Sequence, residues 1–310
     1  MKKTWILLAF TCLLSIPGTY AQQKQEKIGI SLSGYVKNDF FYDSRQTVNA
    51  REGHFLLWPA PLMPDANGID LNDQPTLTML AIQTRLTTKI KGPDAFGAKT
   101  SGLIEGDFFG QANANINLFR LRHAMVKFKW ENTELITGQY WNPLFVAGCF
   151  PATIAFNTGV PIASFSRDPQ IRLTHTVGKV SFLIAALSQR DYPSRGPDPS
   201  DNALTLVSSE FLRNSTVPDM HLRISYNSGN ENNGANILAG AGVEWKKIVP
   251  RLYTVIGDKK YRVNESLSSY TVIVYSKITL PAITIKLQGR YGENIADVLS
   301  VSGFAVRTPA

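Results

Sequence analysis

The chain has 310 residues, with 32 basic and 24 acidic side chains, a formal net charge of +8 and only two cysteines. Beyond the first 21 residues, no segment approaches the roughly eighteen apolar residues of a membrane helix, which excludes helical membrane proteins. The basic residues are dispersed and form no nucleic-acid-binding motif, so we expect no nucleic acid partner.

Residues 1–21 have the features of a secretory signal peptide. Two lysines precede an apolar stretch over residues 5–16, and a cleavage site follows at Ala21. Without the two lysines, 30 basic residues remain against 24 acidic ones, a net charge of +6. Cys149 is then the only cysteine of the exported chain, which excludes an internal disulfide.

The run from Ile28 to Asp43 alternates between two kinds of side chain. A strand has a side-chain period of two, so the run has one apolar and one polar face. Its length exceeds that of an ordinary soluble strand and suits a tilted crossing of a bilayer. The run therefore predicts a transmembrane strand with lipid on one side and water on the other. The apolar set is Ile30, Leu32, Gly34, Val36, Phe40 and Tyr42, and the polar set is Ser31, Ser33, Lys37, Asp39 and Asp43.

Eleven further segments bring the number of predicted strands to twelve, and the connections between them alternate in length. Four of the six connections at one end are long, whereas all those at the other end are short turns. This sorting is typical of outer-membrane barrels and predicts an all-β fold, a transmembrane antiparallel up-and-down β-barrel. The eleven segments are 76–91, 100–111, 117–130, 133–140, 169–176, 179–189, 219–226, 235–247, 268–279, 283–291 and 299–306.

Within the segment 117–130 the alternation changes phase, because Arg120 and Arg122 share a face with apolar residues that follow them. A β-bulge near His123 would restore the pattern. Burial against a neighbouring subunit is the alternative.

Several short strings occur in a particular order along the chain: Gly34–Lys37 with Asp39, Asp43–Arg45, Arg120–Ala124, Gly138–Trp141, Asp168–Arg172 and Gly292–Asn294. In this order they resemble the DcaP-like porins of the outer membrane of Gram-negative bacteria. The resemblance implies a homotrimer of sixteen-stranded barrels that admits small anionic or polar solutes such as dicarboxylates. Because twelve strands are predicted and 307–310 lack a terminal aromatic residue, we expect residues 22–310 to form a barrel domain that is either incomplete at its C-terminus or shorter.

The connection from Trp141 to Asp168 is unusually apolar for a surface loop, so it should fold against something. The porin resemblance implies that it folds into the lumen as a constriction. The alternative is an external cap or a contact between subunits. The residues predicted for this constriction are Trp141, Phe145, Phe150, Phe156, Phe165 and Arg167.

Basic side chains dominate the faces predicted to line the pore. Rings of arginine and lysine favour anions because the low-dielectric wall focuses their field. Acidic residues on the same faces would add a transverse field, or would simply neutralise the basic ones across strands. The predicted pore-lining residues are Lys37, Asp39, Arg85, Lys89, Glu105, Asp107, Arg120, Arg122, Arg172, Arg223, Lys286 and Arg290.

The four histidines are scattered, and none belongs to a serine-containing catalytic motif or to a grouped set of metal ligands. The sequence therefore predicts no catalytic residue, no metal ligand and no cofactor. We expect a passive outer-membrane porin. The alternatives are a barrel enzyme that hydrolyses lipids or esters, and a plugged structural or adhesive barrel.

Overall fold

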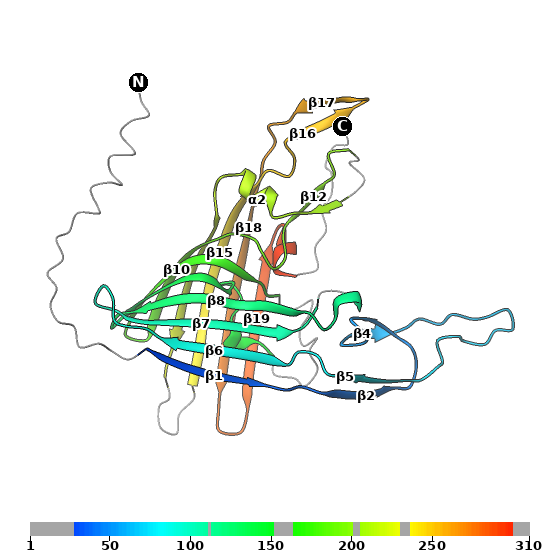
Figure 1. Ribbon diagram of the computed structural model, residues 1–310, viewed down its shortest axis with the longest axis horizontal. Coiled ribbons are helices and arrows are strands. Elements are labelled where there is room, and N and C mark those ends of the chain that lie inside the picture. Colours follow the sequence, from blue (N-terminus) through cyan, green and yellow to red (C-terminus); the bar gives the residue numbers. More distant parts are fainter. Residues whose placement is uncertain (1–27, 111–112, 152–163, 201–204, 230–235, 300–310) are drawn as a thin grey trace.

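The computed structural model describes residues 28–110, 113–151, 164–200, 205–229 and 236–299. Its main element is an eleven-stranded antiparallel sheet whose strand order follows the chain. The strands change direction steadily from β1 to β19, so the sheet curls (Figure 1). They are β1 (Gly29–Tyr35), β6 (Arg85–Lys91), β7 (Lys99–Phe108), β8 (Phe119–Lys129), β9 (Thr133–Trp141), β10 (Arg167–Val177), β11 (Val180–Leu187), β14 (Asp219–Asn227), β15 (Asn236–Ile248), β18 (Leu267–Thr279) and β19 (Thr284–Gly292).

Shorter elements lie at one end of this sheet. Four two-stranded pairs form from β2 (Asp39–Asp43) with β5 (Thr76–Leu80), β3 (Thr47–Ala50) with β4 (Phe55–Pro59), β12 (Arg195–Pro197) with β13 (Thr205–Val207), and β16 (Tyr253–Ile256) with β17 (Lys259–Arg262). Within the described ranges the helices are η1 (Asn113–Asn115), η2 (Ala147–Cys149), α2 (Glu210–Asn214) and η3 (Ile295–Val298). Among the described residues, no helix is long and apolar enough to cross a membrane.

The structure confirms eleven of the predicted strand segments and divides two of them. The segment 28–43 forms β1 and β2, and the segment 76–91 forms β5 and β6. The second break occurs where Gln83 adopts a left-handed backbone with φ of 70° and Ile82 becomes buried. A left-handed residue cannot continue an extended ladder, so the pairing restarts at Arg85. Residues 300–306 of the twelfth predicted strand lie outside the described residues.

The predicted sorting of connections by length is also confirmed. Residues 178–179 join β10 to β11, and residues 280–283 join β18 to β19. The connections at the opposite end span residues 36–84, 109–118, 142–166, 188–218 and 249–266. We call these two ends of the sheet the short-turn end and the long-loop end.

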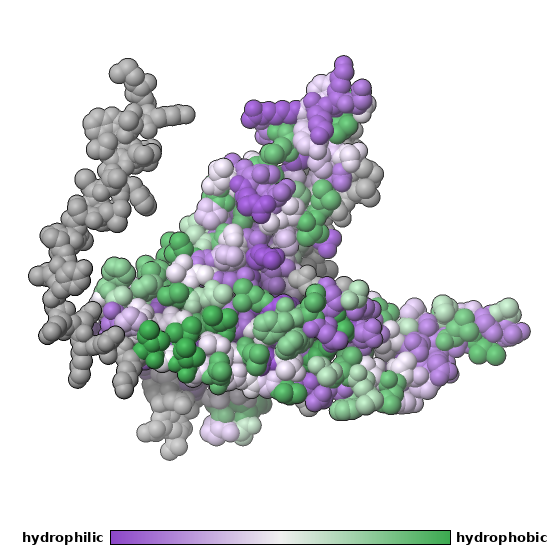
Figure 2. Space-filling model, viewed as in Figure 1, coloured by the Kyte–Doolittle hydropathy of each residue, from purple (hydrophilic) through white to green (hydrophobic). Residues whose placement is uncertain are grey.

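The two faces of the sheet differ in character. On the outer face Leu32 is 79% exposed, whereas on the inner, concave face Arg122 is 5% exposed and Asp107 is fully buried. Apolar side chains also cover the visible face over β1, β6, β7 and β8, whereas polar residues gather on the β16–β17 hairpin (Figure 2). Such an apolar exterior around a polar interior is the reverse of a soluble domain and is typical of a barrel in lipid.

Candidate permeation site

Three arginines and two carboxylates form a cluster on the inner face of β6, β7 and β8. Asp107 stands opposite Arg85 on one side and Arg120 on the other, which places the three side chains in one row across the strands. Asp107 accepts hydrogen bonds from Arg120 at 2.8 Å and from Arg85 at 3.2 Å. Arg122 donates to Glu105 at 2.7 Å and to Asp107 at 3.2 Å. With one more cation than anion, this arginine cluster gives the inner face a local positive charge.

A β-bulge creates this cluster. The pairing of β7 with β8 shifts register, so that Glu105 lies opposite His123 whereas Gly106 lies opposite Leu121. Arg122 is the extra residue, and the resulting shift places Arg120 opposite Asp107, on the inner face that it shares with Arg122. The bulge predicted near His123 is therefore confirmed.

The described part of the apolar loop, residues 142–151 and 164–166, lies against the inner face. Four basic side chains of the strands donate hydrogen bonds to backbone carbonyls of this loop or of Trp141, the residue that precedes it. The pairs are Arg172 with Trp141, Arg223 with Pro143 at 2.5 Å, Arg290 with Leu144 at 3.0 Å and Lys286 with Phe150 at 2.6 Å. These four predicted pore-lining residues therefore hold the loop in place.

Leu144 anchors the loop to the opposite wall. It is fully buried and packs with Val146, Cys149, Ile273 and Tyr275. Gly242 makes room for it, because a Cβ atom at Gly242 would lie 2.7 Å from the Leu144 Cδ2 atom.

We expect Leu144→Ala to weaken docking of the loop by about 2–5 kcal/mol, the usual cost of truncating a buried leucine. We expect Gly242→Val to displace the loop by steric overlap. Both variants should increase open-channel noise in single-channel recordings. Leu57→Ala, which truncates an exposed leucine on β4, is the matched control and should leave the noise unchanged. Quiet channels in both loop variants would contradict the docking.

The predicted aromatic residues of the loop gather into one cluster. Phe145 lies 4.5 Å from Trp141, 5.3 Å from Phe150 and 6.0 Å from Phe165, measured between ring centroids. The Arg167 guanidinium lies 5.4 Å from the Trp141 ring and pairs with Asp191 at 2.7 Å. The sixth residue predicted for the constriction, Phe156, lies outside the described residues.

The turn formed by residues 51–55 reaches the same region from the first long connection. The Arg51 guanidinium lies 4.3 Å from the Phe109 ring, and the His54 ring lies 5.0 Å from that ring. The predicted residues Lys37 and Asp39 pair with each other, and Asp39 also lies 4.0 Å from His54. Burial, reinforced by the positive charge of Lys37, lowers the pKa of His54 from 6.5 to about 4.

Because the pKa of docked His54 is below its free value, the 51–55 turn should lose stability as the pH falls. The loss begins near pH 6.5 and is complete below about pH 4, since only the undocked turn accepts the proton in this window. Hydrogen exchange over residues 47–59, corrected for the intrinsic rate, should therefore increase on acidification. His54→Phe keeps a neutral ring and should remove this increase. An identical response of the variant would refute the assignment.

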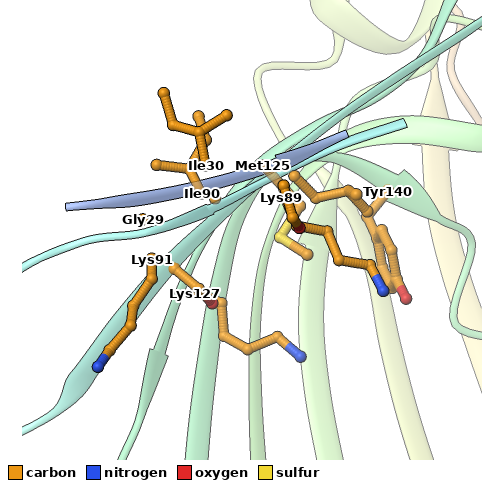
Figure 3. Close-up of a pocket in the computed structure, with 12 residues that line it drawn as sticks. Gly29, Ile30, Lys89, Ile90, Lys91, Met125, Lys127 and Tyr140 are labelled. Carbon is orange, nitrogen blue, oxygen red and sulfur yellow. The ribbon is translucent and has the colours of Figure 1, made fainter. Parts of the chain in front are cut away.

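Three lysines line a hollow of the inner face at the short-turn end. Lys89, Lys91 and Lys127 extend to one side of the ribbon, and Ile30 extends to the other (Figure 3). Lys89 was predicted to line the pore, and Lys91 and Lys127 lie beside it in this hollow. Lys127 is paired with Glu134 at 3.1 Å.

The structure thus sorts eleven of the twelve predicted pore-lining residues into three groups, and the twelfth, Lys89, lines the hollow at the short-turn end. Arg85, Glu105, Asp107, Arg120 and Arg122 come together. Arg172, Arg223, Lys286 and Arg290 hold the loop, while Lys37 and Asp39 form a pair between β1 and β2. Arg51 and Asp191 were missed because they belong to long connections, in which strand periodicity gives no orientation.

A curled antiparallel sheet with long loops at one end, short turns at the other and an apolar exterior is the fold of outer-membrane β-barrels. Among solved structures it is similar to the outer membrane channel DcaP of Acinetobacter baumannii, with a TM-score of 0.59 and 17% identity. That similarity covers 87% of this chain and 66% of the DcaP chain, so this chain spans just under two thirds of that length.

A loop-deletion mutant of OmpT, an outer membrane protein of Vibrio cholerae, matches with a TM-score of 0.47 and 9% identity, over 86% of this chain and 70% of the other. No protein-family model matches the sequence. No curated protein matches it either.

Proposed function

We propose that this protein is an outer-membrane channel for passive diffusion of small hydrophilic solutes, with a preference for anions such as dicarboxylates. The observation that carries the proposal is the arginine cluster, in which Arg85, Arg120 and Arg122 outnumber Glu105 and Asp107 on a concave face. Such an excess of positive charge between low-dielectric walls concentrates anions.

The arrangement along the inner face supports a path for anions. The arginine cluster lies toward the long-loop end, and Lys89, Lys91 and Lys127 lie toward the short-turn end. An anion passing between the ends would meet a basic group at each stage. Selection would depend on the pore width and the field, with no covalent step.

We further propose that residues 1–21 direct export, that outer-membrane lipid surrounds the apolar face, and that the channel is a homotrimer. The exposed apolar side chains on the strands support the lipid contact. The similarity of the sequence strings to DcaP-like porins supports the trimer. Native mass spectrometry of detergent-extracted protein should then give three copies per particle.

Liposome swelling tests the proposed selectivity. Vesicles that contain the protein should admit succinate faster than a neutral solute of similar size, and the neutral solute faster than a diamine. Arg213→Gln, at an exposed helix outside the wall, is the matched control and should preserve this order. Equal rates for the three solutes, or faster entry of the diamine, would contradict the proposal.

A further inference from the structure

A second group of buried polar side chains lies on the inner face, on the strands β14, β15 and β18. His221 stands directly opposite Glu244, and Glu244 stands directly opposite Thr271, so the three form one row across the strands. Asp219 precedes His221 by two residues on the same strand and therefore shares its face. One ligand atom from each of Asp219, His221 and Glu244 lies within 4.8 Å of the others.

These side chains are buried without full hydrogen bonding. Asp219, His221 and Glu244 are each at most 2% exposed, and Thr271 is fully buried. Among the described residues, both ring nitrogens of His221, Asp219 Oδ1, Glu244 Oε2 and Thr271 Oγ1 lack a hydrogen-bond partner. Asp219 Oδ1 and His221 Nε2 face each other at 3.2 Å, which leaves His221 Nδ1, Glu244 Oε2 and Thr271 Oγ1 without any partner in the described part of the chain. Buried polar atoms are nearly always paired, so three unpaired atoms in one place indicate an unfilled requirement for a ligand.

The charges around the group favour a cation. Lys246 donates to Glu244 at 2.8 Å and to both oxygens of Asp297 at 2.7 Å. Arg290 contributes a second positive charge near Glu244 and Asp297. With His221 neutral, as a metal-bound imidazole must be, Asp219, Glu244 and Asp297 carry three negative charges against two positive ones, which leaves one negative charge for a cation to balance.

We propose that Asp219, His221 and Glu244 form a binding site for a divalent transition metal of the zinc type. The Asp219 Oδ1 and His221 Nε2 atoms are 3.2 Å apart. Two ligands of a tetrahedral zinc ion with bonds near 2.0 Å are about 3.3 Å apart, so this spacing fits one edge of the tetrahedron. One imidazole and two carboxylates match the ligand types that zinc accepts, and the Thr271 hydroxyl lies beside them.

A metal bound at this site would link the strands to the helix η3. Lys246 and Gln189 connect Asp297 of η3 to the strand wall, and Gln189 donates to Asp297 at 2.9 Å. A metal bound to Glu244 would fix the carboxylate that accepts the hydrogen bond from Lys246. The metal would therefore tie together β14, β15 and η3 at the long-loop end.

The test is zinc binding by the full chain in detergent. The protein is treated with EDTA, dialysed to equilibrium against zinc, and its metal content is then measured. The wild type should bind one zinc ion per chain, and His221→Gln and Glu244→Gln should each weaken binding at least tenfold. His175→Gln, on β10 and hydrogen-bonded to Thr133, is the matched control and should bind as the wild type does. No stoichiometric binding by the wild type, or unchanged binding by His221→Gln, would overturn the proposal.

Heat-modifiable gel mobility reports whether the variants fold. X-ray absorption on the zinc-loaded wild type identifies the metal ligands even if they do not. The spectrum should show one imidazole nitrogen and otherwise oxygen ligands. A spectrum with several imidazoles or with none would overturn the assignment. In that case a proton shared by Asp219 and His221 would balance the charge.

Discussion

Replacing residues 144–165 by a short glycine–serine linker should raise single-channel conductance about twofold or more, because a pore conducts according to its narrowest section. The described part of this loop lies along the inner wall, held by four basic side chains and by buried Leu144. Its ends are already adjacent, since the Asn142 amide donates to the Ser166 carbonyl at 2.9 Å. The deletion can therefore be closed without disturbing β9 or β10.

The same deletion should strengthen anion selectivity. Arg223, Lys286 and Arg290 donate hydrogen bonds to loop carbonyls in the intact protein. Removing residues 144–165 takes away the acceptors of Lys286 and Arg290. Their charges would then face water in the pore. Planar-bilayer recordings measure conductance and reversal potential together.

The matched control is deletion of residues 253–262, the β16–β17 hairpin, which projects away from the sheet (Figure 1). Its ends are also joined, since the Val263 amide donates to the Leu252 carbonyl at 3.0 Å. This control should leave conductance unchanged. A loop deletion that conducts like the wild type would show that the loop does not restrict the pore.

Neutralising Arg120 and Arg122 together should abolish or reverse the preference for anions. The arginine cluster would then hold one arginine against Glu105 and Asp107, and its local charge would change from positive to negative. Because the wall focuses the field, we expect the anion-to-cation permeability ratio to fall about tenfold in Arg120→Gln/Arg122→Gln.

The converse variant, Glu105→Gln/Asp107→Asn, should increase anion preference, since three arginines would remain without carboxylates. Arg213→Gln removes one exposed positive charge away from the wall and is the control. A reversal potential that is the same in all of these variants would show that the arginine cluster does not set selectivity.

Strand periodicity and connection length predicted the sheet well because both depend on local rules. Outward residues such as Ile171 and Leu173 alternate with the inward Arg172, and the structure retains that pattern. The phase change near His123 even located the bulge. Periodicity failed at Gln83, where a left-handed residue interrupts a long strand, and within the long connections that form β3, β4, β16 and β17.

The partners of inward side chains could not be predicted in the same way. A period of two assigns Arg223 and Arg290 to the inner face but gives no information about what covers them, and here loop carbonyls do. Likewise, Asp219, His221 and Glu244 come from two strands and lie side by side only through the register of β14 with β15. The register of two consecutive strands depends on the geometry of the connection between them, which strand periodicity does not give.

Single-channel conductance and ion selectivity of the mature chain in a planar bilayer test whether this protein is an anion-preferring channel. We expect steady openings with a reversal potential displaced toward that of chloride in a potassium chloride gradient. Insertion without conductance, or openings that select cations, would contradict an anion-preferring channel.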